Sequence, residues 1–338
     1  MTKELNDIAK KLSSPPKGIL AADESTNTIK KRFETIGLDS TFENRRRYRE
    51  ILFTSNKLSH YISGIILYDE TIKQSTSEGV PFPEFLKKNN IFPGIKVDTG
   101  AIPILAKSSE KITEGLDGLG KRLDDYKNLG AKFTKWRAII EIGDSTPSDY
   151  AIKTNSFILA RYAKIVQDHG LVPIVEPEVL MDGAHTIDDC YKVTKKTLLY
   201  VFDELKSHDV FLGGILLKPN MVISGKKCST QATISEVSKY TIKCLKETVP
   251  HDVPGIVFLS GGQSNEIATQ HLNEMNKNND LPWNLSFSYG RALQQPSISS
   301  WKGLEENVSI SQDALVKRSK LNSEATVGNY SSNLEHSL

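Results

Sequence analysis

The chain has 338 residues, a length that fits one large α/β domain or two domains of ordinary size. Its formal net charge is only +2, with acidic and basic residues interspersed, which argues against a face that binds nucleic acid. The three cysteines lack a Cys-x-x-Cys spacing, and no apolar stretch is long enough to span a bilayer, which argues against a disulfide framework, a zinc knuckle and membrane insertion. We therefore expect a cytoplasmic protein.

The first expected elements are a helix near residues 2–13 and a short buried strand at residues 18–23, which ends in the carboxylate of Asp23. A second helix follows, in which Thr28 and Arg32 lie one turn apart and so share a face. This arrangement, an apolar run that ends in charge and is followed by a helix, recurs along the chain.

Eight apolar runs have the pattern of buried strands, and most of them contain or end in charged residues. They cover residues 18–23, 63–69, 94–98, 131–140, 171–178, 211–217, 255–262 and 285–291. Segments with helical apolar spacing lie between several of them, at residues 150–169, 187–207 and 233–249. Strand alternating with helix eight times is typical of a parallel sheet with crossover helices.

The span from residue 18 to residue 291 matches the roughly 250 residues of a closed (β/α)8 barrel. An open doubly wound sheet is the alternative, but it would normally carry a Gly-rich phosphate turn after its first strand, and residues 21–25 are no such turn. No low-complexity linker interrupts the series. The sequence therefore predicts one α/β domain: a TIM barrel at about 18–291 with an extra N-terminal helix, and a C-terminal helix at residues 304–323 plus a short tail within 292–338.

Lys218 is the most unusual residue at a strand end. The apolar run at residues 211–217 stops at this lysine, and Pro219 after it cannot donate to a ladder. A lone lysine in this place often only begins a solvated loop. Several other runs also end in charge, however, and the active sites of barrels lie at the carboxyl ends of their strands. We therefore expect Lys218 to face the barrel mouth.

Residues two apart on a strand point the same way, so Lys135 shares a direction with Arg137, and Glu176 with Glu178. The charged residues expected to point inward at the mouth are Asp23, Lys96, Lys135, Arg137, Glu176, Glu178 and Lys218. Three carboxylates would face four cations, and a buried charge is costly unless it is paired. This set comes closest to neutrality if one lysine loses its proton.

Schiff-base chemistry on a ketone or aldehyde requires a neutral amine, and burial near a like charge lowers the pKa of a lysine. We take Lys218 as the candidate nucleophile, with Lys135 as the cation that lowers its pKa. The alternative is a structural ion-pair network that fills the barrel mouth.

Small polar residues gather at the last two strand ends, around Ser260 and Gly261 and around Ser288, Gly290 and Arg291. In barrels these loops commonly present backbone N–H groups to a phosphate, although Ser-Gly-Gly alone is equally well a turn. The seven histidines form no strand-end cluster and no cysteine falls at a strand end. We therefore expect neither a metal site nor a cofactor, and no cysteine nucleophile.

Taken together, these residues resemble the class I fructose-bisphosphate aldolase family. The matching segments lie at residues 18–26, 43–46, 94–98, 135–137, 172–178, 216–221, 258–264 and 287–293. The resemblance extends to about Tyr330. It implies a metal-independent barrel enzyme of glycolysis and gluconeogenesis, usually a homotetramer, that cleaves fructose 1,6-bisphosphate to dihydroxyacetone phosphate and glyceraldehyde 3-phosphate.

The resemblance also implies roles for single residues. Lys218 would form the Schiff base, Glu176 would serve as acid and base for carbinolamine dehydration, and Asp23 would handle the proton of the C4 hydroxyl. Lys135 and Lys96 would assist electrostatically. The remaining residues would support this set or bind substrate phosphates: Arg137, Glu178, Ser260, Gly261, Ser288, Gly290 and Arg291, with Arg32 and Thr28 at a second phosphate.

Two of the sequence's departures from the family bear on the site. Thr99 stands where the family commonly has lysine, and Leu338 stands at the end, where much of the family has a tyrosine. That tyrosine is thought to move the proton at C3 of the enamine. Tyr330 would substitute for it if the tail folds back, or it packs at the end of the C-terminal helix.

Two other functions stay open at this point. The substrate could be a related ketose phosphate, such as sedoheptulose 1,7-bisphosphate or fructose 1-phosphate. The chain could also act mainly as a scaffold, because the family is associated with cytoskeletal and membrane-protein partners. A full set of strand-end charges favours catalysis, since a scaffold has no need of a costly buried charge cluster.

Overall fold

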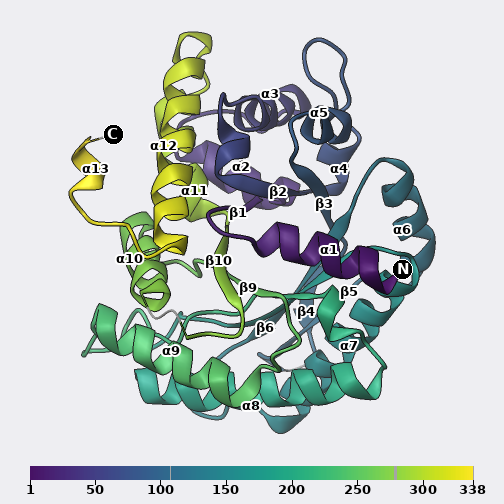
Figure 1. Ribbon diagram of the computed structural model, residues 1–338, viewed down its shortest axis with the longest axis vertical. Coiled ribbons are helices and arrows are strands. Elements are labelled where there is room, and N and C mark those ends of the chain that lie inside the picture. The colour runs from purple at the N-terminus through teal and green to yellow at the C-terminus, as the bar shows by residue number, and fades with distance from the viewer. Residues whose placement is uncertain (107, 278–279, 338) are drawn as a thin grey trace.

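Eight parallel strands form a closed barrel in the computed structural model, which describes residues 1–106, 108–277 and 280–337 (Figure 1). The strands are β1 Gly18–Ala21, β2 Ile62–Leu67, β3 Phe92–Lys96, β6 Phe133–Ile140, β7 Val172–Val179, β8 Leu216–Leu217, β9 Gly255–Phe258 and β10 Asn284–Tyr289. They pair in this order around the barrel, and β10 closes onto β1. Each overlaps one of the eight expected runs, so the (β/α)8 prediction is confirmed.

Helices surround the strands and connect them. They are α1 Thr2–Ser13, α2 Thr26–Glu34, α3 Phe42–Phe53, α4 Asp69–Ile72, α5 Phe82–Lys88, α6 Leu119–Asn128, α7 Asp149–Asp168, α8 Ile187–Ser207, α9 Ile234–Thr248, α10 Asn265–Asn276, α11 Arg291–Trp301, α12 Val308–Thr326 and α13 Leu334–Ser337. Several begin at side-chain caps. Thr186 and Thr233 form capping boxes at α8 and α9, and Ser148 caps α7. These caps fix where each helix starts above its strand.

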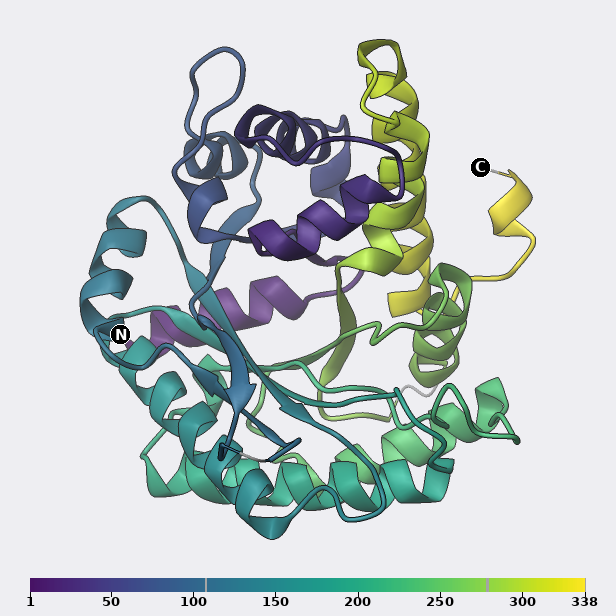
Figure 2. The same cartoon turned by 180° about the vertical axis from the view of Figure 1, so that it is seen from behind.

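The extra N-terminal helix α1 closes one end of the barrel. Leu5, Ile8 and Leu12 of α1 belong to one buried cluster with residues of several strands, among them Ile19 and Phe133. Helix α1 lies in front of the strands in Figure 1 and behind them in Figure 2. The opposite end, at the carboxyl ends of the strands, is therefore the one left open.

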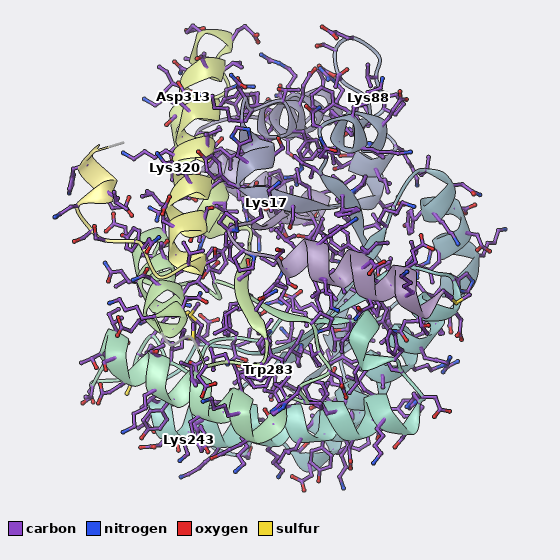
Figure 3. All side chains as sticks on the ribbon, viewed as in Figure 1. Lys17, Lys88, Lys243, Trp283, Asp313 and Lys320 are labelled. Atoms are coloured by element: carbon purple, nitrogen blue, oxygen red, sulfur yellow. The ribbon has the colours of Figure 1, made fainter. Side chains whose placement is uncertain are left out.

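A second apolar layer fills the space between the strands and the outer helices. Trp136 is fully buried there, with its ring centroid 5.3 Å from that of Tyr162 on α7. Trp136 therefore faces the helices, and its neighbours Lys135 and Arg137 point to the interior of the barrel. Figure 3 labels charged side chains at the periphery, such as Lys243 on α9 and Asp313 and Lys320 on α12.

The expected strand at residues 211–217 is wrong over most of its length. A 3-10 turn, η2 Leu212–Gly214, replaces it, and only the two residues of β8 are strand. The Gln167 side chain donates to Phe211 O and Gly214 O, and its Oε1 accepts from Phe211 N. These bonds satisfy backbone groups that a longer strand would have paired in the ladder.

Two further elements differ from expectation. A hairpin of β4 Gly100–Pro103 and β5 Lys111–Glu114 follows β3, and the sequence analysis did not predict it. The C-terminal helix expected at residues 304–323 is α12, and α11, which precedes it, was not expected. None of the helices in the described part of the chain is both long and apolar enough to cross a membrane.

Candidate active site

The open end of the barrel contains a cavity of about 1050 Å³. All the predicted site residues line it: Asp23, Thr28, Arg32, Lys96, Lys135, Arg137, Glu176, Glu178, Lys218, Ser260, Gly261, Ser288, Gly290 and Arg291. They come from the carboxyl ends of the barrel strands and the segments that follow them. The structure therefore brings the whole predicted set into one site.

Four charged groups of alternating sign form a chain across this cavity. Lys218 Nζ lies 3.2 Å from Glu176 Oε1, and Glu176 Oε2 lies 3.4 Å from Lys135 Nζ. Lys135 Nζ in turn lies 2.7 Å from Asp23 Oδ2. Lys218, Glu176 and Lys135 are each 4% exposed. Each lysine thus has a carboxylate within reach for proton transfer.

The electrostatics of this chain favour the ionised carboxylates. Burial pushes the pKa of Asp23 upward, but Lys135 and then Lys218 outweigh it and hold that pKa well below its usual range. Burial likewise raises the pKa of Glu176, and Lys218 and Lys135 bring it below the ordinary value. Burial lowers the pKa of Lys135, but Asp23 and Glu176 raise it above the ordinary value. Lys135 is therefore a firmly protonated cation.

A fourth carboxylate corrects the charge count made from the sequence. Asp98 is buried, and its Oδ1 lies 2.5 Å from Lys96 Nζ. Arg137 pairs with Glu178 through its Nε. The inward set therefore balances without a neutral lysine, so charge counting no longer identifies the nucleophile. The position of Lys218 beside Glu176 now carries that assignment.

A buried network lies behind Asp23. Glu24 forms ion pairs with two arginines, with Oε1 2.5 Å from Arg32 Nη1 and Oε2 2.6 Å from Arg49 Nη2. The Gln294 side chain donates to Glu24 Oε1 at 2.8 Å and to Ala21 O at 2.7 Å. Arg49 is 2% exposed. Glu24 therefore fixes the head of Arg32 at the edge of the cavity.

The ends of β9 and β10 form the side of the cavity that suits an anion. Gly261 and Gly262 both have positive φ, at 60° and 113°, a conformation that favours glycine. Arg291 begins α11, is exposed, and has no hydrogen-bond or ion-pair partner among the described residues. The buried Ser288 hydroxyl likewise has no hydrogen-bond partner there. These groups are available to a phosphate.

The second expected phosphate position is close to the first. A Cβ placed on Gly290 would lie 3.8 Å from Arg32 Nη2, so Arg32 reaches toward the end of β10. Thr28 is exposed, and its hydroxyl lies 3.1 Å from Ser25 Oγ. The two groups of phosphate-binding candidates therefore line one continuous cavity.

Tyr330 lies away from this cavity. It is 6% exposed, its N–H donates to Asn273 Oδ1 at 2.8 Å, and its hydroxyl donates to Glu335 Oε1 at 2.8 Å. Burial, followed by the bond to Glu335, raises the pKa of Tyr330 to about 12. The structure therefore shows the packed arrangement of the two considered for Tyr330. Leu338, which stands where much of the family has a tyrosine, lies outside the described residues.

Sequence reasoning missed four residues of the site: Glu24, Arg49, Asp98 and Lys226. Glu24 lies just beyond the expected strand at residues 18–23, where alternation no longer fixes side-chain directions. Asp98 is the last residue of the expected strand at residues 94–98, two residues after Lys96, so alternation already indicated its direction and the charge count left it out. Arg49 comes from α3 and Lys226 from a loop, and no periodic pattern links either to the barrel. Within the described part of the chain, no three His, Cys, Asp or Glu side chains are placed to hold a metal ion.

Comparisons with known proteins agree with this geometry. A family model described as fructose-bisphosphate aldolase class-I matches residues 4–338. A Xanthomonas axonopodis pv. citri protein named "Probable fructose-bisphosphate aldolase class 1" is 53% identical over 97% of this chain and 98% of its own length. "Fructose-bisphosphate aldolase 4, cytosolic" of Arabidopsis thaliana is 49% identical over 97% of this chain and 84% of its own length.

A solved structure is similar over almost the whole fold. It is fructose-bisphosphate aldolase from Plasmodium falciparum in complex with TRAP and a small-molecule inhibitor. It superposes with a TM-score of 0.96 at 48% sequence identity and covers 98% of this chain and 96% of its own. These matches confirm the resemblance drawn from the sequence. The chain belongs to the class I fructose-bisphosphate aldolase family.

Proposed function

We propose that Lys218 forms the Schiff base through which this aldolase acts on its ketose substrate. The observation that carries the proposal is the buried Lys218 amine in the cavity, with Glu176 Oε1 3.2 Å from Nζ. A carboxylate at that distance can take a proton from the nitrogen and give it to a departing hydroxyl. Lys135 is the poorer nucleophile, because its ion pair with Asp23 raises its pKa.

The activity that goes with this family is the reversible, metal-independent aldol cleavage of fructose 1,6-bisphosphate. The products are dihydroxyacetone phosphate and glyceraldehyde 3-phosphate, and the reaction belongs to glycolysis and gluconeogenesis. The substrates are thus phosphorylated sugars. The residues take the roles in the individual steps that the family resemblance implies for them.

The first steps join the Lys218 nitrogen to the C2 carbonyl carbon. The carbinolamine that forms loses water when Glu176 gives a proton to the departing hydroxyl, which leaves an iminium ion. The C4 hydroxyl then gives its proton to Asp23 while the C3–C4 bond breaks. The electron pair of that bond moves through C3 to the iminium nitrogen, which gives an enamine and frees the aldehyde. A substrate phosphate oxygen or water then gives a proton to C3, which restores the iminium ion, and a second water hydrolyses that ion, which releases the ketone and restores the amine.

The other site residues position the substrate. Lys135 and Lys96 stabilise charge near the reacting carbons, and Arg137 with Glu178 supports this set. Arg291, Ser260, Gly261, Ser288 and Gly290 bind one phosphate, and Arg32 with Thr28 binds the other. The support is that all of them line the cavity that contains Lys218. Whether Tyr330 takes part in the C3 proton transfer is a separate question, and its burial argues that it does not.

Kinetics on the purified protein test the proposal. Fructose 1,6-bisphosphate should be cleaved with and without EDTA, and faster than sedoheptulose 1,7-bisphosphate or fructose 1-phosphate. Arg291→Ala should raise KM by about tenfold or more with a smaller fall in kcat, because a charge-assisted phosphate contact is lost. Loss of activity in EDTA that zinc restores, or an equal fall in kcat with KM unchanged, would contradict the assignment.

Four further expectations are also proposals. We treat the chain as a single domain, supported by its one closed barrel. A homotetramer and a protein partner of cytoskeletal or membrane type follow from the family resemblance alone. A cytoplasmic location is supported by the word "cytosolic" in the name of the Arabidopsis relative. Sedimentation of the purified protein checks the tetramer.

A further inference from the structure

We propose that Lys226 is a further phosphate-binding residue of this site, which Asp182 holds in place until substrate arrives. Lys226 comes from the loop between β8 and α9, and it lines the same cavity as Lys218. The inference rests on the proposed function, since it assumes a phosphorylated substrate in that cavity. It assigns to Lys226 the phosphate at the ends of β9 and β10, together with Arg291.

The geometry around Gly262 carries the proposal. A Cβ placed on Gly262 would lie 2.8 Å from Lys226 Nζ and 3.2 Å from Arg291 Nη2. Two cations from different loops therefore converge on one point above the glycine turn. Two like charges that both reach the same point repel each other, and an anion between them removes the repulsion. A phosphate with two negative charges fits that place.

The backbone of the Lys226 loop is held firmly over the site. The N–H groups of Gly225, Lys226 and Lys227 donate to the carbonyls of His185, Met181 and Gly183 at 2.9, 2.8 and 2.8 Å. These three bonds join the loop after β8 to the loop after β7. The main chain therefore sets the position of the Lys226 backbone, and the side chain is held separately, by its ion pair with Asp182.

The side chain of Lys226 has an exposed partner that it can exchange. Lys226 Nζ lies 2.8 Å from Asp182 Oδ1, and the two side chains are 41% and 62% exposed. An ion pair with that exposure contributes little to stability. A phosphate dianion, which carries more charge than Asp182 and lies beside Arg291, is the stronger partner. Substrate therefore competes with Asp182 for the lysine.

The position of the Ser260–Gly262 turn beside β8 indicates which of the two substrate phosphates Lys226 would bind. Lys218 follows β8, and Leu217 pairs with Ile256 on β9, whose strand leads into the Ser260–Gly262 turn. The phosphate bound at that turn is therefore the one on the carbon next to the Schiff-base carbon. Fructose 1-phosphate carries this phosphate and lacks the distal one.

Steady-state kinetics on three variants test the inference. Lys226→Met should raise KM for fructose 1,6-bisphosphate about tenfold with little change in kcat, because a charged contact to the phosphate is lost. Asp182→Asn should lower KM about twofold, because it removes the competing carboxylate. The double variant should match Lys226→Met. Lys227→Met is the matched control: it removes a positive charge from the next residue in the chain and should leave KM unchanged.

Lys226→Met should raise KM and Asp182→Asn should lower it, and these opposite changes distinguish phosphate binding from a structural role. If the Lys226–Asp182 pair only stabilised the loops, both single variants would change KM in the same direction and would unfold at a lower temperature. Fructose 1-phosphate should show the same KM ratio as the bisphosphate. Equal effects of the two single variants, an effect of Lys227→Met as large as that of Lys226→Met, or a KM change confined to the bisphosphate would each overturn the inference.

The same assays distinguish this inference from the proposed function. If the unmodified enzyme cleaves fructose 1,6-bisphosphate and Arg291→Ala raises KM while Lys226→Met does not, only the role of Lys226 is wrong. If the unmodified enzyme shows no Schiff-base-dependent cleavage, the proposed function itself fails.

Discussion

The two ends of the barrel are built from the same strands, but they contain different chemistry. On β6, Phe133 points into the end that α1 closes, and two residues later Lys135 points into the open cavity. On β7, Ile174 lies in the apolar cluster and Glu176 in the cavity. A step of two residues along a strand therefore changes an apolar layer into a charged layer.

This difference indicates which end stabilises the protein and which end performs the reaction. Burial of apolar surface stabilises the closed end in proportion to the area removed from water. Charges at the open end lose hydration on burial, and their pairing offsets that cost only in part. We therefore expect substitutions at the open end to affect catalysis most and substitutions at the closed end to affect stability most.

Removal of the amine at the open end should have the largest effect. Lys218→Met should lower kcat by about 10⁴-fold or more, because the covalent intermediate can no longer form. Its thermal unfolding temperature should change far less than kcat, because Glu176 keeps its ion pair with Lys135 when Lys218 is replaced by an apolar side chain of similar length. A variant that retains a tenth of the activity would show that another lysine is the nucleophile.

The closed end should respond in the opposite way. Leu12 of α1 is fully buried among the residues of that end. Leu12→Ala should lower the free energy of unfolding by about 2–5 kcal/mol through lost burial and a residual cavity, with KM and kcat unchanged. Urea unfolding and steady-state kinetics measure the two quantities. A large loss of kcat with unchanged stability would contradict the division between the ends.

The change of unfolding free energy with pH should be smaller than the two effects above. It should come from the charged groups at the open end. The pKa of Asp23 is lowered in the folded protein, so its ionisation stabilises the fold above the ordinary carboxyl pKa. That contribution, on the order of 2 kcal/mol, is lost as pH falls through the lowered pKa. Between about pH 5 and pH 2 the unfolding free energy should therefore fall less steeply in Asp23→Asn than in the unmodified protein. Parallel slopes would contradict the expected coupling.

The same layers explain what the sequence could predict. Apolar runs of strand length and segments of helical apolar spacing are local signals, and the barrel prediction followed from their repetition. The stretch at residues 211–217 failed because the side chain of Gln167, distant in sequence, takes its backbone hydrogen bonds. No local pattern reports such a contact.

The candidate site was predictable wherever its residues lie on strands. Lys135 and Glu176 follow from alternation, and Lys218 from its place after an apolar run. Glu24 turns out to be an ion-pair partner of Arg32 and Arg49, which only the tertiary fold brings together. The charge balance inferred from sequence was wrong because it left out Asp98, which pairs with Lys96, two residues before it.

Covalent trapping tests the central claim most directly. Borohydride added together with dihydroxyacetone phosphate should reduce the Schiff base to a stable secondary amine and inactivate the protein. Mass spectrometry of the digested protein should locate the adduct on Lys218. An adduct on Lys96 or Lys135, or no adduct at all, would contradict the claim that the Lys218–Glu176 pair is the reacting centre.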